Sequence, residues 1–434
     1  MSNLLIGFLG IGSLLLLLAF RVPIAVALGL VSFFGIAAAT SMRAAWGMLS
    51  AVPFNFIGDW SLSAIPMFLL MGFITSRTGL TDGLYRAMRI VFHRVPAGLA
   101  VASVGACSLF AAASGSSIAT SAAMARISIP EMLRYRYDPG LACGVVASAG
   151  TLGSLIPPSI LLVIYGVFAQ VSIGQLFLAG VIPGLISALI YVAMIVARAT
   201  ARPSIAPTLA EKPTADDVRS AFREVWPLPV LIAGVLGGIF YGLFSPTEAG
   251  AVGAVLASAI AGFRGHLSLL NIKDAIIDTA VSTCAIFVIA IGAVLFTRFM
   301  ALTAVPDFLS GWLLGNTDND LLIILQIAII IIILGMFIDS IGILLLTLPI
   351  LIPVVNGAEI NLIWFGIIMI KLLEIGLITP PVGLNIYVVK SALGDAVSLS
   401  VMFRGVAWFV VADIATLLLL IAFPVLTLLL PSYM

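Results

Sequence analysis

The chain has 434 residues, of which 62% are hydrophobic and only 9% are charged, with a formal net charge of +1. Soluble domains carry about a quarter charged residues, so this composition excludes an ordinary soluble protein. The sequence also lacks a basic surface domain, and we therefore expect no nucleic-acid partner.

Apolar runs that can cross a lipid bilayer occur along the whole chain. A spanning helix needs roughly 20 mainly apolar residues. Examples of such runs, some of them short or broken by Pro and Gly, lie at 4–20, 24–39, 62–74, 173–196 and 228–244. The first run has no charged segment before it and no small-residue cleavage site after it, so we expect a retained span rather than a signal peptide. We predict an all-α polytopic membrane protein in contact with a lipid bilayer.

The sequence repeats itself at an offset of 223 residues. Four prolines meet prolines at this offset, namely 23 with 246, 130 with 353, 157 with 380 and 158 with 381. With 22 prolines in the chain, chance predicts about 0.5 matched pairs, although the adjacent pair counts twice. Prolines cluster at helix ends in any membrane protein, but clustering does not explain one gapless register. We therefore predict an internal duplication.

Each half divides into three spans, a re-entrant hairpin, a broken span and a final span. The first repeat covers 1–197, with its hairpin at 97–125 and its broken span at 140–168. A polar, Pro-rich linker follows at 198–227, in which Thr214 can cap a short surface helix. The second repeat covers 228–434, with its hairpin at 321–355 and its broken span at 362–391. Five crossings in each half require inverted repeats, which are typical of secondary transporters.

The basic residues support this topology. It places 17 of the 20 Lys and Arg residues on one face, and the exceptions are Arg43, Arg298 and Lys371. Positive residues favour the cytoplasmic side of a membrane. We therefore expect this face to be cytoplasmic and both termini to lie on the opposite side.

Polar residues gather at the centres of the two predicted hairpins. Segments 111–120 (AAASGSSIAT) and 335–344 (GMFIDSIGIL) align at the offset, which places Ser116 opposite Asp339 and Ser117 opposite Ser340. Small and hydroxylated residues allow the chain to unwind there, and its free oxygens suit a hard cation such as Na⁺. The alternative is close helix packing by small residues. That alternative is weaker for Asp339, because an ionisable group inside a membrane is usually functional.

Paired prolines interrupt the two predicted broken spans, in segments 150–160 (GTLGSLIPPSI) and 374–385 (EIGLITPPVGLN). Two successive prolines remove backbone donors and force the preceding residue out of helical geometry. Carbonyls around 153–156 and 376–379 are thereby freed, where the charges of helix ends suit a cation and an anionic substrate. A plain kink is the alternative, and its recurrence in both halves argues against it.

Several charged residues lie in or beside the predicted spans. Arg298 is either an interfacial anchor or a bidentate ligand of a substrate carboxylate. Glu248 favours the start of a helix. Lys371 and Glu374 lie three residues apart on one helix face and are predicted to form an ion pair. Asp413 stands alone in an apolar span, and the sequence assigns it no role.

The SGSS hairpin tip, the GTLGSLIPPS and TPPVGLN broken helices, the SPTEAG start of the second half and the FTRFM segment together resemble one family. This family is the large membrane subunit of tripartite ATP-independent periplasmic (TRAP) transporters, and the resemblance runs the whole length of the chain. It implies Na⁺-driven import of an organic acid, such as a C4-dicarboxylate, sialic acid or another sugar acid, across the bacterial inner membrane. Both termini would then be periplasmic.

The resemblance also implies two protein partners and a mode of movement. A soluble periplasmic binding protein would deliver the substrate, and a small four-helix membrane subunit would pack beside the large one. We expect no fused small subunit, since no span precedes residue 4. The implied fold is an elevator, in which hairpins and broken helices form a mobile transport domain and the other spans form a scaffold.

The resemblance further implies at least two Na⁺ sites and no organic cofactor. One Na⁺ site would include Ser114, Ser116, Gly153 and Pro158, and a second would include Asp339, Gly376 and Thr379. Further candidate Na⁺ ligands are Ser117, Ile156, Ser340 and Pro381. The candidate substrate-binding residues are Arg298, which would lie nearest the carboxylate, and Thr120, Thr151 and Asn385.

Other classes of protein fit the sequence less well. A stand-alone Na⁺-coupled carboxylate or anion transporter of related architecture would work without a binding protein. A channel would not need two matched broken helices. An enzyme would need a metal cluster or paired catalytic acids, whereas the only histidines, His93 and His266, fall in predicted loops and no HExxH motif occurs. We therefore expect no enzymatic activity.

Overall fold

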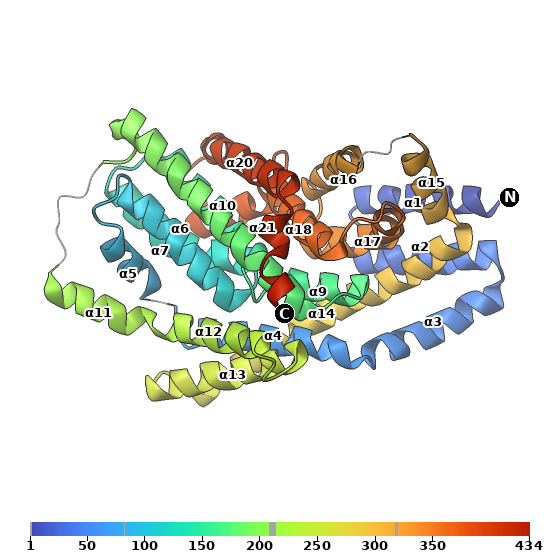
Figure 1. Cartoon of the computed structure of the whole chain (residues 1–434), viewed down its shortest axis with the longest axis horizontal. Helices are drawn as coiled ribbons and strands as arrows, with labels where there is room; N and C mark the ends of the chain where they lie inside the picture. Colours follow the sequence, from blue (N-terminus) through green and yellow to red (C-terminus); the bar gives the residue numbers. More distant parts are fainter. Residues whose placement is uncertain (1, 82, 208–213, 317–319) are drawn as a thin grey trace.

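The structure, a computed structural model, describes residues 2–81, 83–207, 214–316 and 320–434, and within these ranges it contains helices and no strand. Seven of the described helices are long and apolar enough to cross a membrane. An eighth span results if Met42–Ile57 and Trp60–Arg77, which are bent by 57° at their junction, count as one. The prediction of an all-α polytopic membrane protein is confirmed (Figure 1).

The described helices of the first half follow one another with short turns. They are α1 (Asn3–Ala19), α2 (Ile24–Ala39), α3 (Met42–Ile57), α4 (Ala64–Arg77), α5 (Leu84–Val91), α6 (Gly98–Ser114), α7 (Ser117–Arg134), α8 (Pro139–Leu155), α9 (Ile160–Ala169) and α10 (Ile173–Ala201). The linker contains α11 (Ala215–Val225).

The helices of the second half repeat this order. They are α12 (Pro227–Phe240), α13 (Pro246–Phe263), α14 (Leu269–Thr303), α15 (Val305–Asn316), α16 (Asp320–Gly335), α17 (Ser340–Gly357), α18 (Leu362–Ile378), α19 (Leu384–Leu393), α20 (Leu399–Ala422) and α21 (Val425–Leu428). Adding 223 to the bounds of α7 and α8 gives 340–357 and 362–378, which are the bounds of α17 and α18. The helix α14 is continuous where the first half has α3 and α4.

The helices pack as two groups. In the scaffold group, α2 packs against α14, and α4 packs against α13 and α14. In the hairpin group, α8 packs against α6, α7 and α20, while α18 packs against α16, α17 and α20. Figure 1 shows α3, α4, α12 and α13 along the lower edge, with the hairpin group above them. The candidate site lies where these two groups meet.

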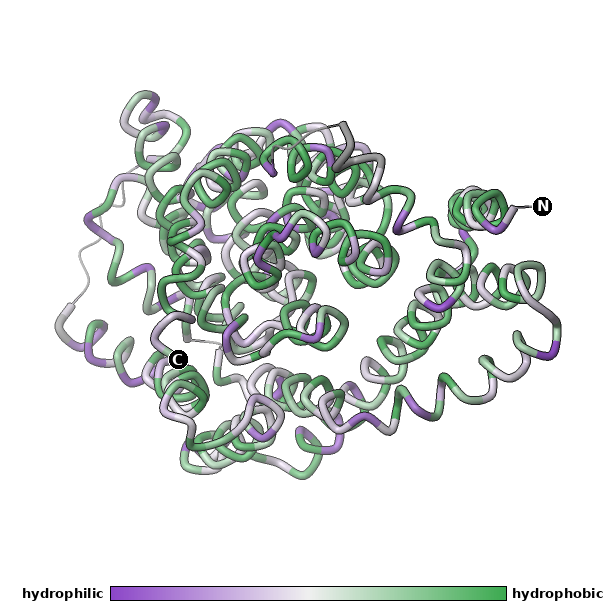
Figure 2. The backbone as a smooth tube through the Cα atoms, turned by 45° about the vertical axis from the view of Figure 1, so that its right-hand side comes forward, coloured by the Kyte–Doolittle hydropathy of each residue, from purple (hydrophilic) through white to green (hydrophobic). Residues whose placement is uncertain are grey.

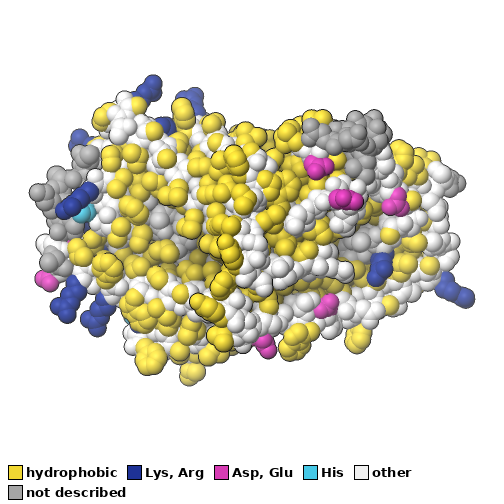
Figure 3. All heavy atoms as spheres, viewed as in Figure 1, with side chains coloured by type: hydrophobic (Ala, Val, Ile, Leu, Met, Phe, Trp, Pro, Cys, Tyr) yellow, Lys and Arg dark blue, Asp and Glu magenta, His cyan; other side chains and the backbone are white. Residues whose placement is uncertain are grey.

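The outer surface is largely apolar, as contact with lipid requires. Large side chains such as Phe54 and Phe263 are 80% and 91% exposed. Figure 3 shows hydrophobic side chains over most of the visible face, with Lys and Arg gathered mainly at the left end. Figure 2 shows hydrophilic residues concentrated in α11 and in the turns between helices.

Helix ends differ from the predicted boundaries at two places. The helix α7 continues to Arg134, nine residues beyond the predicted end of the first hairpin. Its charged last turns are stabilised by an ion pair between Glu131 and Arg89, with an oxygen–nitrogen distance of 2.8 Å. The helix α10 continues to Ala201, so residues 198–201 of the predicted linker are helical. Residues 208–213 of that linker lie outside the described residues.

Two predicted helix starts have the expected capping interactions. The Thr214 hydroxyl accepts a hydrogen bond from the Asp217 backbone N–H at the start of α11. At the start of α13, the Glu248 carboxylate accepts a hydrogen bond of 2.7 Å from the Ser245 backbone N–H. Both starts are capping boxes. Glu248 therefore stabilises a helix end, as its position in SPTEAG predicts.

The helices α8 and α20 touch through their backbones, which yields a test of the packing. A Cβ atom added to Gly405 would lie 1.8 Å from the carbonyl oxygen of Gly140. Gly405→Leu should push α20 away from α8 and destabilise the protein by about 1–3 kcal/mol or more. We expect a lower melting temperature of the purified protein in detergent.

The matched control is Gly237→Leu on α12, because no atom lies within 4 Å of a Cβ added there. Equal melting temperatures for the two variants would contradict the backbone contact between α8 and α20.

Candidate functional site

Two helix pairs, α6–α7 and α16–α17, reverse direction at short polar tips. The first tip (115–117) begins with Gly115, whose φ of +61° allows the chain to turn after α6. Ser116 is the N-cap of α7 and accepts a hydrogen bond from Ala119 N–H at 3.4 Å. In the second tip (336–340), Asp339 is the N-cap of α17 and accepts from Gly342 N–H at 3.0 Å. The aligned residues Ser116 and Asp339 therefore share one structural position.

Paired prolines separate α8 from α9 and α18 from α19. The peptide bonds between Pro157 and Pro158 and between Pro380 and Pro381 are both cis. The first break covers 156–159, and the second covers 379–383. Each proline pair thus interrupts a helix in the region that the sequence predicts.

Bare backbone brings each hairpin against the broken helix of its own half. A Cβ added to Gly153 would lie 2.9 Å from the carbonyl carbon of Ser116. A Cβ added to Gly376 would lie 2.6 Å from the Cα of Gly335. Only glycine leaves room for these approaches, so both positions fix the distance between hairpin and break.

The two tips share one small cavity of about 90 Å³. Its polar lining residues come from both tips and from α8, and they are Ser116, Ser117, Ser154, Asp339 and Ser340. The Ser117 and Ser154 hydroxyls are hydrogen-bonded to each other. The cavity has room for about three water molecules, each taking about 30 Å³. The structure therefore joins four predicted Na⁺ ligands and adds Ser154, which the sequence reasoning missed although it lies within GTLGSLIPPS.

This donor set has the chemistry of an alkali-cation site. Hydroxyl oxygens, backbone carbonyls and one carboxylate are hard ligands, which suit Na⁺ rather than a transition metal. Among the described residues, no group of three or more His, Cys, Asp or Glu side chains could hold a metal ion. The residues around the two tips thus fit Na⁺, with Asp339 as the single carboxylate in the lining.

Other candidate residues lie beside this cavity rather than in its lining. Ser114 and Thr120 are hydrogen-bonded to each other at 3.0 Å, and Ser114 and Ser116 line a second cavity of about 300 Å³ between the first tip and helices α4 and α14. Gly376 accepts a hydrogen bond from Thr379 N–H at 3.2 Å at the end of α18. The remaining Na⁺ candidates, Ile156, Pro158 and Pro381, lie in the breaks themselves.

The candidate substrate ligands do not converge. Thr151 is buried in α8, where its hydroxyl donates to the Ser148 carbonyl at 2.7 Å. Asn385 is buried in α19 and donates to the Ala147 carbonyl at 3.2 Å. Arg298 is exposed on α14 and lines neither cavity. Their assignment as substrate ligands stays a prediction.

A basic residue that sequence reasoning did not single out lies near the second tip. Arg21, in the turn between α1 and α2, lines a cavity of about 480 Å³ together with Asp339. Arg21 adopts a φ of +61°, an uncommon conformation for a residue other than glycine. The sequence carries no signal for this placement, because it depends on how the turn packs against the hairpin group.

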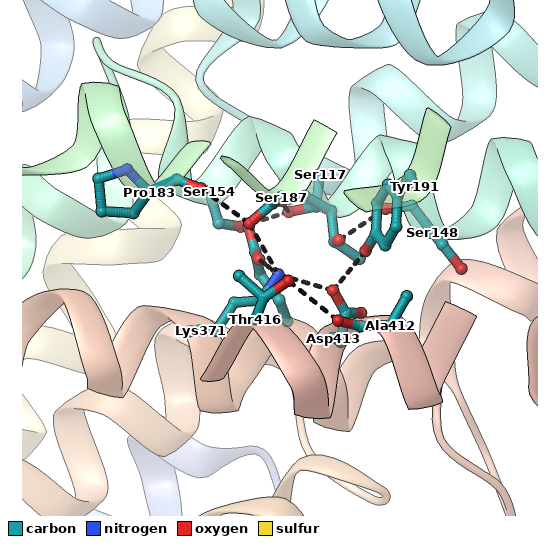
Figure 4. A network of polar contacts seen from close by, with 12 residues as sticks. Ser117, Ser148, Ser154, Pro183, Ser187, Tyr191, Lys371, Ala412, Asp413 and Thr416 are labelled. Atoms are coloured by element: carbon teal, nitrogen blue, oxygen red, sulfur yellow. Dashed lines mark hydrogen bonds and ion pairs between the residues drawn. The ribbon is translucent and has the colours of Figure 1, made fainter. Parts of the chain in front are cut away.

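A buried ionic network lies behind the second break (Figure 4). The Lys371 ammonium donates to Asp413 at 2.6 Å, to Glu374 at 3.1 Å and to the Ser187 hydroxyl at 3.3 Å. The Tyr191 hydroxyl also donates to Asp413, at 2.6 Å. All five residues are 0% exposed.

The predicted ion pair between Lys371 and Glu374 is confirmed. The partner of Asp413 was missed, although one general signal pointed to it. Charged groups inside a membrane protein pair with one another, and Asp413 is an isolated carboxylate in an apolar run.

Known proteins share this architecture. The fold is similar to that of the YdaH transporter from Alcanivorax borkumensis, with a TM-score of 0.63, 12% sequence identity, and coverage of 87% of this chain and 88% of that one. At this level of identity the likeness concerns the fold alone.

Two relatives are similar in sequence. The C4-dicarboxylate TRAP transporter large permease protein DctM of Pseudomonas aeruginosa is 34% identical over 376 residues, which cover 86% of this chain and 87% of that protein. The isethionate TRAP transporter permease protein DctMQ of Oleidesulfovibrio alaskensis is 32% identical over 378 residues, which cover 87% of this chain. The chain spans 59% of the length of that second relative.

Residues 11–426 match the family described as the DctM component of the tripartite ATP-independent periplasmic transporter. The match covers nearly the whole chain and both hairpins, so it confirms the resemblance found in the sequence motifs. The chain belongs to the DctM family, the large permease component of TRAP transporters.

Proposed function

We propose that this protein is the membrane permease of a Na⁺-driven, binding-protein-dependent importer of an organic anion in the bacterial inner membrane. The observation that supports this function is the cavity shared by the two hairpin tips, which is lined by hydroxyls and by Asp339. The named substrates of the two relatives, isethionate and C4-dicarboxylates, are both small organic anions. We extend that substrate class, including sialic acid and other sugar acids, to this chain.

Na⁺ coupling follows from the donor set. The first tip offers neutral oxygens, and the second adds a carboxylate that balances the charge of a cation. At least two Na⁺ ions would bind, one near Ser116 and Gly153 and one near Asp339 and Gly376. Arg298 would then attract the substrate anion from α14.

The proposed movement is that of an elevator. The hairpin group would move as the transport domain against the scaffold group, with the two halves acting as inverted repeats and both termini in the periplasm. The position of the second cavity supports this movement, because α4 and α14 form one wall and the first tip forms the other. Gly72 of α4 approaches the tip closely, since a Cβ added there would lie 3.1 Å from the Ser114 carbonyl oxygen.

Two partners complete the proposed system. A periplasmic binding protein would deliver the anion, and a small four-helix membrane subunit would pack beside the scaffold group. The relative named DctMQ supports the second partner, because 41% of its length lies outside the part covered by this chain. That fraction is the remainder of the 59% covered.

The proposed function is tested by reconstitution in proteoliposomes. Uptake of a radiolabelled C4-dicarboxylate should require an inward Na⁺ gradient, the small membrane subunit and the cognate binding protein. K⁺ in place of Na⁺ should abolish uptake. Uptake by this chain alone would show instead a stand-alone Na⁺-coupled anion transporter, and gradient-independent uptake would remove Na⁺ coupling.

The role of Asp339 is tested by Asp339→Asn. Asparagine caps a helix as well as aspartate does, so α17 should stay folded while the cavity loses its negative charge. We expect Na⁺-dependent uptake to be lost, with an unchanged melting temperature in the absence of Na⁺. Asp320→Asn, at the other end of the same hairpin, is the matched control and should transport normally. Full uptake by Asp339→Asn would exclude Asp339 from the cation site.

A further inference from the structure

The buried ionic network described above lies outside both cavities but is connected to the second hairpin. Its members come from three helices, namely α18 with Lys371 and Glu374, α20 with Asp413, and α10 with Ser187 and Tyr191. One ammonium therefore joins three helices in the interior of the hairpin group (Figure 4). Removing one partner from a buried pair leaves an uncompensated charge, so the three helices are held together strongly.

The anchored segment is the last part of α18, which ends at the second break. Gly376 follows Lys371 by five residues, a rise of about 7.5 Å along the helix. Gly376 is also the point at which α18 touches Gly335 of the second hairpin. A displacement of this helix end would therefore move the second tip and Asp339 with it.

The first half has no such charged anchor. Subtracting 223 from positions 371 and 374 gives Ser148 and Thr151, which are neutral and bond only within α8 in the described residues. The charged anchor thus accompanies the tip that carries Asp339. The other tip is held by neutral contacts.

We propose that Lys371 is a positioning residue for cation binding at the second tip. It acts through α18 by fixing Gly376, and hence the second hairpin, relative to α10 and α20. This inference rests on the proposed Na⁺ coupling, and it assigns to Lys371 no direct contact with Na⁺ or substrate.

The test is the Na⁺ dependence of uptake by Lys371→Met in proteoliposomes. The Na⁺ concentration for half-maximal uptake should rise about tenfold, whereas the substrate concentration for half-maximal uptake at saturating Na⁺ should change less than threefold. Asp413→Asn keeps one ammonium and one carboxylate in the network, so it should fold and show a smaller rise in the same direction. Lys390→Met, which removes a lysine paired with Asp395 on the surface, is the matched control.

Unchanged Na⁺ half-saturation in both network variants, with only a lower melting temperature, would overturn the positioning role. Loss of folding in Lys371→Met leaves Asp413→Asn to decide by the same measurement. Na⁺-independent uptake by the unmodified protein would instead refute the proposed function, so the two failures are distinguishable.

A second inference comes from an asymmetry between the matched halves. In the first half, α4 and α5 pack against α6. In the second half, the equivalent helices α14 and α15 pack against α17. Within the described part of the chain, α4 and α5 make no comparable contact with α7, nor does α14 with α16. The scaffold thus covers opposite arms of the two hairpins.

Burial follows the same asymmetry. The helix α6 buries 13 of its 17 residues, whereas the equivalent α16 buries 6 of 16. The helix α7 buries 8 of 18 residues, whereas the equivalent α17 buries 12 of 18. Ile118 on α7 and Phe337 beside α16 are 46% and 60% exposed. Each hairpin therefore has one covered arm and one open arm.

The two open arms match the covered arms in sequence position. Gly342 on α17 is covered by Ile24, whose Cδ1 would lie 2.3 Å from an added Cβ. Subtracting 223 from 342 and adding 223 to 24 gives Ala119, which is exposed, and Thr247. The covered pair in one half thus has an open counterpart in the other.

We infer that the open arms are docking surfaces for scaffold segments of this same chain. In a second state, the turn before α13 covers the α7 arm at Ala119, and α14 covers the α16 arm at Phe337. The contacts of the two halves are then exchanged. This inference rests on the proposed movement and specifies residue pairs that meet in the second state.

The test is disulfide formation in a variant whose native cysteines are replaced by serine. The pair Ile24→Cys and Gly342→Cys should cross-link in the state described here. The pair Ala119→Cys and Thr247→Cys should cross-link in the second state, with a yield that Na⁺ or substrate changes. The pair Ala119→Cys and Val255→Cys is the control, since Val255 lies two turns further along α13 and points to solvent or lipid.

Formation of both predicted disulfides, without the control disulfide, is the expected result. Failure of Ala119→Cys and Thr247→Cys to cross-link under every ligand condition would overturn the exchange of contacts. The readout is cross-linking rather than uptake, so it stands apart from the test of Na⁺ coupling.

Discussion

The close backbone contact between hairpins and broken helices is the constraint on which the site depends. Gly153 and Gly376 leave no room for a side chain against Ser116 and Gly335. Unwound backbone in an apolar layer is tolerated only where protein or a cavity surrounds it. Tip and break supply these surroundings for each other, as the hydrogen bond of 3.4 Å from Ile160 N–H to the Gly115 carbonyl shows. The oxygens of both hairpins are thereby gathered in one small volume.

The duplicated architecture carries an unequal distribution of charge. Ser116 and Asp339 hold the same N-cap position, yet only the second can neutralise a cation. The charged members of the buried network also lie in the second half, at Lys371, Glu374 and Asp413. Symmetric helices thus provide equivalent positions, and the side chains make the two halves different. A transporter with one neutral and one charged cation site needs this combination.

Local sequence predicts what depends on local geometry. The offset of 223 residues and the paired prolines predict both tips and both breaks, because caps, glycines and prolines act over a few residues. The partner of Asp413 was not predicted, because Lys371 lies 42 residues earlier and meets it only through the packing of α18 on α20. Arg21 reaches the Asp339 cavity for a similar reason. The exposed Arg298 shows the converse, since a motif does not reveal where its side chain lies.

The charge of the shared cavity suggests why cation and anion transport would be coupled. In the proposed cycle, an anion about 4 Å from an ionised Asp339 would be repelled by about 4 kcal/mol at an effective dielectric constant of about 20. A Na⁺ beside Asp339 removes this repulsion, and a second Na⁺ among the neutral oxygens of the first tip leaves one net positive charge. The anion is then attracted only after both cations have bound. Electrostatics alone would therefore impose the order in which cations precede the substrate.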